Sequence, residues 1–132
     1  RIQINQDGLA PYIQWPEYTT RGEPSYLLFA QGCGGILYPP GALHPEVHNR
    51  EAFMELSPTA DDVWFKAMVL YNGVPHVKIS ERHRDFPPVY GSQAEGQTLH
   101  HVNNTLGHND QQVAAVFSRY DLVSRLKAAA SE

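Results

Sequence analysis

Two adjacent carboxylates, Asp61 and Asp62, stand in the segment TADDVW, where the pattern indicates the start of a helix. A carboxylate there can accept hydrogen bonds from the first amides of the helix, which have no intrahelical partner. It can equally act as a general base that takes a proton from an attacking hydroxyl. Capping needs one carboxylate, and here two stand beside Trp64. Asp61 and Asp62 are therefore candidate helix caps and candidate catalytic residues.

The seven histidines are the next groups that could do chemistry. His44 and His48 have the four-residue spacing of two metal ligands on one helix face, but Pro45 between them disfavours a regular helix. A second set, near the C-terminal end, has intervals that match no structural zinc framework: His100, His101 and His108, with Asp110 nearby. We expect most histidines to be polar surface residues. A small metal-dependent hydrolase that uses them is kept as an alternative.

The single cysteine, Cys33, lies within the run GCGG, which a rigid Pro39-Pro40 corner follows. Glycines let backbone or a ligand approach closely, because no Cβ stands in the way. No histidine can be assigned to Cys33 as a catalytic partner, so we expect a buried small residue in a tight turn. One cysteine also excludes an intramolecular disulfide, and this favours a cytoplasmic protein.

The bulk composition excludes several classes of protein. The 132 residues are enough for one domain, and a hydrophobic content of 42% with 18% charged residues is typical of a globular chain. The net charge of −4 lacks the basic footprint of a nucleic-acid-binding protein. No run approaches eighteen apolar residues, so we expect no membrane span. Neither of the glycine-rich phosphate-binding motifs is present.

Alternating apolar and polar residues predict short strands at 1–4, 26–30, 35–38 and 74–80. A 3.6-residue period predicts a helix at 49–56, with Asn49 as its N-cap. It predicts a second helix that begins with Thr59 as N-cap and ends at Asn72-Gly73. Residues 81–108 are the least regular, and Asn109 then caps a further helical stretch. The sequence thus predicts an α/β fold, a mixed sheet with flanking helices, over residues 1–132 as a single domain or fragment.

Several segments, taken in order, resemble the C-terminal half of a bacterial glycosyltransferase with the GT-A fold. The resemblance covers residues 1 to about 122, and it lies in the order and spacing of the motifs. These segments are GCGGILYPPGAL, the E-x-F-x-x-L of 51–56, TADDVWFKAMVLYNGV, VYGSQ and the NDQQ of 109–112.

The resemblance implies a reaction and a set of site residues. Enzymes of this fold bind a nucleotide-sugar in an N-terminal half, where a DxD motif holds Mn²⁺ or Mg²⁺ on the diphosphate. The C-terminal half builds the acceptor side and supplies a base from an acidic motif at a helix start, which points to Asp61 and Asp62. The expected reaction is metal-dependent, inverting transfer of a sugar to an acceptor hydroxyl. The other residues implied are Gly34, Gly35, Trp64, Asn109 and Asp110 for substrate, and His108 for the metal.

The sequence departs from this family in one important respect. It contains no DxD motif and no N-terminal donor-binding half. We therefore expect a fragment that is inactive by itself and that pairs with its missing half or self-associates. The alternative is a non-catalytic carbohydrate-binding module in which exposed aromatic rings stack on sugars: Tyr12, Trp15, Tyr18 and Trp64.

Overall fold

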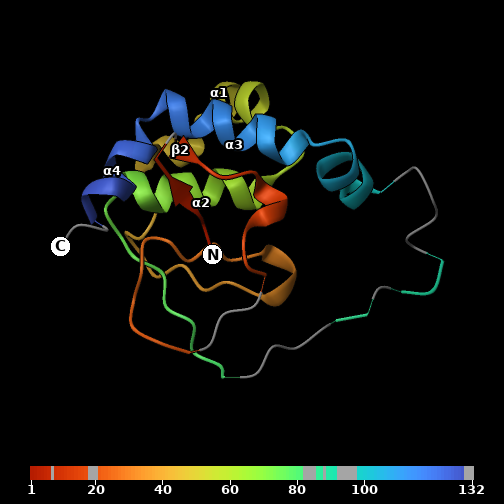
Figure 1. Ribbon diagram of the computed structural model, residues 1–132, viewed down its shortest axis with the longest axis horizontal. Helices are drawn as coiled ribbons and strands as arrows, with labels where there is room; N and C mark the ends of the chain where they lie inside the picture. The colour runs from red at the N-terminus through yellow and green to blue at the C-terminus, as the bar shows by residue number, and fades with distance from the viewer. Residues whose placement is uncertain (7, 18–20, 82–85, 88, 92–97, 130–132) are drawn as a thin grey trace.

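One central helix, α2 (Asp61–Tyr71), organises the structure. The computed structural model describes residues 1–6, 8–17, 21–81, 86–87, 89–91 and 98–129. Around α2 lie three further α-helices and four short helical turns (Figure 1). They are α1 (Arg50–Leu56), α3 (His108–Arg119), α4 (Leu122–Ala129), the 3-10 turns η1 (Tyr12–Gln14), η2 (Gly32–Gly34) and η3 (Pro45–His48), and the π-helix η4 (His101–Thr105).

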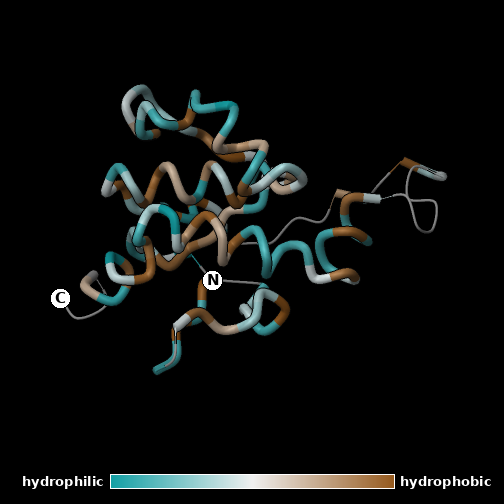
Figure 2. Tube along the Cα trace, turned by 90° about the horizontal axis from the view of Figure 1, so that it is seen from above, coloured by the Kyte–Doolittle hydropathy of each residue, from teal (hydrophilic) through white to brown (hydrophobic). Residues whose placement is uncertain are grey.

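Burial of α2 follows from its sequence, because a helix that is apolar on nearly all sides belongs inside a protein. Seven of its eleven residues are buried. Figure 1 shows α3 beside it, with the N-terminal ends of both helices at the end of the molecule where η1 lies. Hydrophobic and hydrophilic stretches alternate along the helices, as amphipathic packing requires (Figure 2). The partners of α2 in the core include Val113, Val116 and Phe117 of α3 and Leu122 and Leu126 of α4.

The N-terminal segment contributes a small antiparallel sheet of two strands, β1 (Ile4–Asn5) and β2 (Gly8–Leu9). Ile4 pairs with Leu9 in this hairpin. The hairpin places Ile2, Ala10 and Trp15 in the same core as α2. Residues 1–6 and 8–15 are thereby held against the helices.

The predicted mixed sheet is the main error of the sequence analysis. Helices and one two-stranded sheet make up the regular structure of the described residues, and the predicted strands at 26–30, 35–38 and 74–80 are absent. A single bridge between Ser25 and His76 is the pairing found there. Alternation makes a strand only where a neighbouring strand supplies its backbone partners. In the second and third of these segments apolar side chains face outward instead, with Leu37 90% and Ile79 84% exposed, whereas Leu27 and Phe29 of the first pack against the core.

The helix predictions are confirmed in the main. Asn49 caps α1 as expected, since its side chain accepts a hydrogen bond from the amide of Ala52 at 3.1 Å. Gly73 ends α2 with a positive φ of 70°, a conformation that glycine adopts without strain. The helices are short, and α3 has 12 residues. None of the described helices has the length and the apolar run needed to cross a bilayer.

Two predicted helix caps are wrong. The N-cap of α2 is Ala60, because the hydroxyl of Thr59 turns away to Asn103 at 2.7 Å. The N-cap of α3 is Gly107, in the left-handed conformation with φ 73°. Asn109 lies inside α3 and is buried. In both places a tertiary contact or a glycine replaces the local cap that the sequence favours.

Candidate functional site

Each carboxylate of the acidic pair accepts a hydrogen bond from the amide of the next residue in the first turn of α2. Oδ1 of Asp61 accepts a hydrogen bond from the amide of Asp62 at 3.0 Å. Oδ1 of Asp62 accepts one from the amide of Val63 at 2.9 Å. The two side chains differ in their surroundings, since Asp61 is exposed and Asp62 is half-buried. These bonds satisfy two amides of the first turn, although neither aspartate is the N-cap, and a catalytic role is compatible with them.

Burial distinguishes Asp62 as a chemical group. It raises the pKa of the Asp62 carboxyl, and the neighbouring charge of Asp61 adds to the effect, while the hydrogen bond from Val63 opposes it. No positive charge from the described part of the chain offsets the shift. A carboxylate whose pKa is raised in this way is a stronger base than an ordinary surface aspartate.

The charge of Asp62 contributes to the raised pKa of two tyrosines. Burial raises the pKa of Tyr38 to about 12, and the charges of Asp62 and Asp61 raise it further. The pKa of Tyr12 is also raised, by burial first and then by Asp62, against a hydrogen bond from Gln31. Both phenols are therefore protonated at neutral pH and can act as hydrogen-bond donors.

The glycine-rich turn comes to the same region. Its Cys33 lies near enough to Tyr12 for a thiolate there to raise the pKa of that phenol. Gly34 and Gly35 are exposed, and a Cβ at either would meet nothing within 4 Å. Gly35 needs to be glycine for its φ of 80°. Cys33 is exposed as well, so its predicted burial is wrong; a 3-10 turn on the surface presents the side chain to solvent.

Of the two residues expected from the NDQQ motif, Asp110 reaches this region and Asn109 does not. Oδ1 of Asp110 accepts a hydrogen bond from the backbone amide of Tyr12 at 2.6 Å. Asn109 is 7% exposed and donates from Nδ2 to Asn104, while its Oδ1 has no partner among the described residues. Asn109 thus pairs with Asn104 and not with the residues around Asp62.

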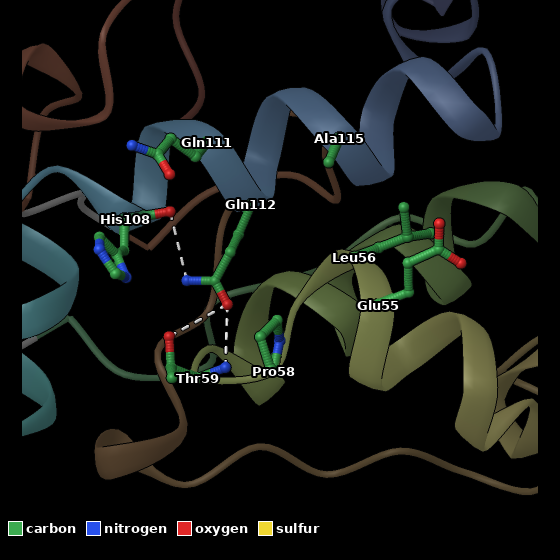
Figure 3. Close-up of a pocket in the computed structure, with 8 residues that line it drawn as sticks. All are labelled: Glu55, Leu56, Pro58, Thr59, His108, Gln111, Gln112 and Ala115. Carbon is green, nitrogen blue, oxygen red and sulfur yellow. Dashed lines mark hydrogen bonds between the residues drawn. The ribbon is translucent and has the colours of Figure 1, made fainter.

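His108 lines a separate hollow of about 220 Å³ between the end of α1 and α3. Figure 3 shows its imidazole apart from the carboxylate of Glu55. Gln112 crosses this hollow and accepts hydrogen bonds from the amide and the hydroxyl of Thr59 at 2.9 and 3.2 Å (Figure 3). The described residues contain no group of three or more His, Cys, Asp or Glu that could hold a metal ion. Within the described ranges His108 therefore belongs to no such group.

The aromatic rings considered for sugar binding are mostly internal. Trp64 is 2% exposed, and its Nε1 donates to the carbonyl of Val47 at 3.2 Å. Trp15 is 6% exposed and donates to the carbonyl of Ala10. Tyr18 falls outside the described residues. The two indoles thus have no free face on which a sugar could stack in this structure.

A buried amine that the sequence pattern did not single out lies on the same helix as the acidic pair. Lys66 is 1% exposed, and its Nζ lies 2.8 Å from the carbonyl of Tyr26 and 3.1 Å from Nδ1 of His76. Burial lowers the pKa of Lys66 to about 7. Burial, with the charge of Lys66, lowers that of His76 to about 4. The sequence feature that could have identified Lys66 is a single cation within the apolar run VWFKAMVL, four residues after Asp62.

The charge of Asp62 thus acts on Tyr12 and Tyr38, and Tyr12 accepts a hydrogen bond from Gln31 at the start of the glycine-rich turn, whereas Asn109, His108 and Trp64 lie elsewhere or are buried. Asp110 joins the group through the backbone of Tyr12. Comparison with known proteins finds no family model, no curated protein and no solved structure that matches the chain.

Proposed function

We propose that the chain is the acceptor-side region of a nucleotide-sugar glycosyltransferase of the GT-A type, and that Asp62 is its general base. The observation that carries the proposal is the setting of the Asp62 carboxylate. It is half-buried, has a raised pKa and lies near two protonated phenols. A general base needs a pKa closer to the operating pH than an ordinary carboxylate has, and burial shifts Asp62 in that direction.

In the proposed reaction an acceptor hydroxyl attacks the anomeric carbon of the donor sugar. The new bond joins the acceptor oxygen to this carbon, and the bond from the carbon to the diphosphate oxygen breaks. The nucleoside diphosphate leaves with the electron pair, and the hydroxyl proton passes to the carboxylate of Asp62. The phenols of Tyr12 and Tyr38 donate hydrogen bonds to acceptor oxygens and orient them. Attack opposite the leaving group inverts the anomeric centre.

The described residues do not fit a metal centre, so no step of this proposal runs through a metal. In the proposal, the donor half holds the nucleotide diphosphate together with any Mn²⁺ or Mg²⁺ that neutralises it. The acceptor side contributes orientation and a base, and these need only the groups around Asp62. Sugar transfer accordingly requires both halves together.

The test is sugar transfer by the natural gene product that carries this chain, with UDP-, GDP- and dTDP-sugars as donors. Asp62→Asn should lower kcat by about 10²- to 10⁴-fold, the usual contribution of a general base. Asp61→Asn should have a smaller effect, because Asp61 is exposed and acts through its charge on Asp62. Glu51→Gln removes a comparable exposed carboxylate from the first turn of α1 and serves as the control. Wild-type turnover in Asp62→Asn would overturn the assignment.

A further inference from the structure

Lys66 lies in the middle of the central helix, at a place where an apolar residue would be expected. It is 1% exposed and is flanked along α2 by buried apolar residues. No carboxylate within the described ranges pairs with its amine. A buried amine without an anionic partner costs free energy, so its position calls for a compensating role. The two hydrogen-bond partners of the Lys66 amine indicate what this role is.

Both partners belong to irregular segments that lie against α2. Nζ donates to the carbonyl of Tyr26 at 2.8 Å and contacts Nδ1 of His76 at 3.1 Å. The same two segments are bridged by their backbones, since Ser25 and His76 exchange hydrogen bonds of 2.8 and 3.2 Å. The hydroxyl of Tyr26 also donates to the carbonyl of Gly73 at 3.1 Å. Lys66 therefore fastens this bridge to the helix.

His76 in turn contacts Tyr38, a residue of the candidate site. The ring of Tyr38 meets the imidazole of His76 edge-on, with centroids 6.3 Å apart and planes at 79°. The ring of Tyr38 also packs against the ring of Phe65, with centroids 5.7 Å apart. Phe65 follows Asp62 by three residues on α2. His76 and Phe65 thus hold Tyr38 near the carboxylate of Asp62.

We propose that Lys66 is a positioning residue that fixes Tyr38 beside Asp62 through the imidazole of His76. The inference rests on the proposed function, because it assigns a purpose to the phenol next to the proposed base. Lys66 does not touch substrate and acts through other side chains. An apolar residue of similar length fills the same volume, but it gives no donor to the carbonyl of Tyr26 and leaves the imidazole free to turn.

The experiment compares Lys66→Met, which keeps the length of the side chain, with the wild-type chain by NMR. Two readouts follow Tyr38: the cross-relaxation between its ring and that of His76, and the titration of its phenol through the ring carbon shift. In Lys66→Met we expect the ring contact to be lost and the titration midpoint to fall from about 12 towards the ordinary value of 10. Arg50→Met removes an exposed cation from α1 and should change neither readout.

A second variant covers the case in which Lys66→Met does not fold. His76→Phe keeps an aromatic ring of similar shape and removes the nitrogen that faces Nζ. If Lys66 acts through that nitrogen, the Tyr38 titration moves in this variant as well. If the ring merely fills space, the titration stays in place. An unchanged Tyr38 midpoint in either folded variant overturns the proposal.

A separate experiment measures sugar transfer by the natural gene product. Lys66→Met should raise the KM for the acceptor by about tenfold and change kcat less, because orientation of the acceptor is lost while the base remains. An acceptor KM equal to that of wild type would overturn the role in acceptor binding. The NMR readouts do not depend on transfer, so failure of the glycosyltransferase assignment and failure of the positioning of Tyr38 are distinguishable.

Discussion

Asp110 and Tyr12, which are 98 positions apart in the chain, are joined by a 2.6 Å hydrogen bond from the backbone amide of Tyr12 to Oδ1 of Asp110. Asp110 stands in the first turn of α3, and Tyr12 begins η1. The bond therefore holds the N-terminal segment at the N-terminal end of α3. The position of Tyr12 in the candidate site therefore depends on Asp110 in α3.

Replacement of Asp110 tests this link. Asp110→Ala should lower the free energy of unfolding by about 1.5–3 kcal/mol, since the bond has a charged acceptor. Urea denaturation at pH 7 measures the loss. Asp110→Asn keeps an oxygen acceptor and should lose less. Glu51→Ala removes an exposed acidic residue from the first turn of α1 as a control, and an equal loss there would contradict the special role of Asp110.

The buried amine makes stability depend on pH. The pKa of Lys66 is about 7 in the folded chain and 10.5 ordinarily, so between these values the unfolded state binds a proton that the folded state lacks. Stability therefore rises with pH in this window, by about 3 kcal/mol from pH 7 to pH 9.5. Urea denaturation across the window should show the rise in wild type and not in Lys66→Met. Parallel pH dependences would contradict the burial of a titrating amine.

The pKa of Asp62 has the opposite consequence. Because it is raised in the folded chain, the stability that the residue contributes is full below its ordinary pKa of 3.8 and is lost as the pH rises through the folded value. Asp62→Asn does not ionise and can still accept from the amide of Val63. It should be more stable than wild type at pH 7, by about 0.5–1 kcal/mol, and not at pH 3. Thermal unfolding at the two pH values measures this, with Glu51→Gln unchanged.

The amide of Gln112 supports the start of α2 through Thr59. Its Oε1 accepts from both the amide and the hydroxyl of Thr59, so Gln112→Leu leaves a part-buried amide without its partner. The expected loss is about 1–3 kcal/mol in the free energy of unfolding. Gln111→Leu changes the exposed neighbour that lines the same hollow and should stay within about 0.5 kcal/mol of wild type. Similar losses in the two variants would contradict the prediction.

Local patterns predicted the helices and failed for the strands. The α1 and α2 predictions needed only an apolar period, the Asn49 cap and the Asn72-Gly73 stop, and the structure contains all of these. The strand predictions needed neighbouring strands that the described residues do not supply. Thr59 shows the limit of local rules for caps, because its hydroxyl is used by Asn103 and Gln112, 44 and 53 residues away.

The candidate site was predictable in part for the same reason. The acidic pair was visible as two carboxylates at a helix start, and the structure separates them by burial. Lys66 and His76 went unnoticed because their pairing joins a helix to a distant irregular segment, which no periodicity encodes. The effect of Asp62 on Tyr12 and Tyr38 similarly depends on the path of the chain. Cys33 was assigned to the interior because small residues usually pack there.

The exposed thiol of Cys33 provides a single attachment site for a spectroscopic label. A maleimide fluorophore or a nitroxide attaches at this single position without any substitution, because the sequence holds no other cysteine. The label then stands in the neighbourhood of Tyr12, whose phenol is affected by charge at Cys33. Its emission or its spin relaxation therefore follows occupation of that neighbourhood directly, in a chain whose own residues are all unchanged.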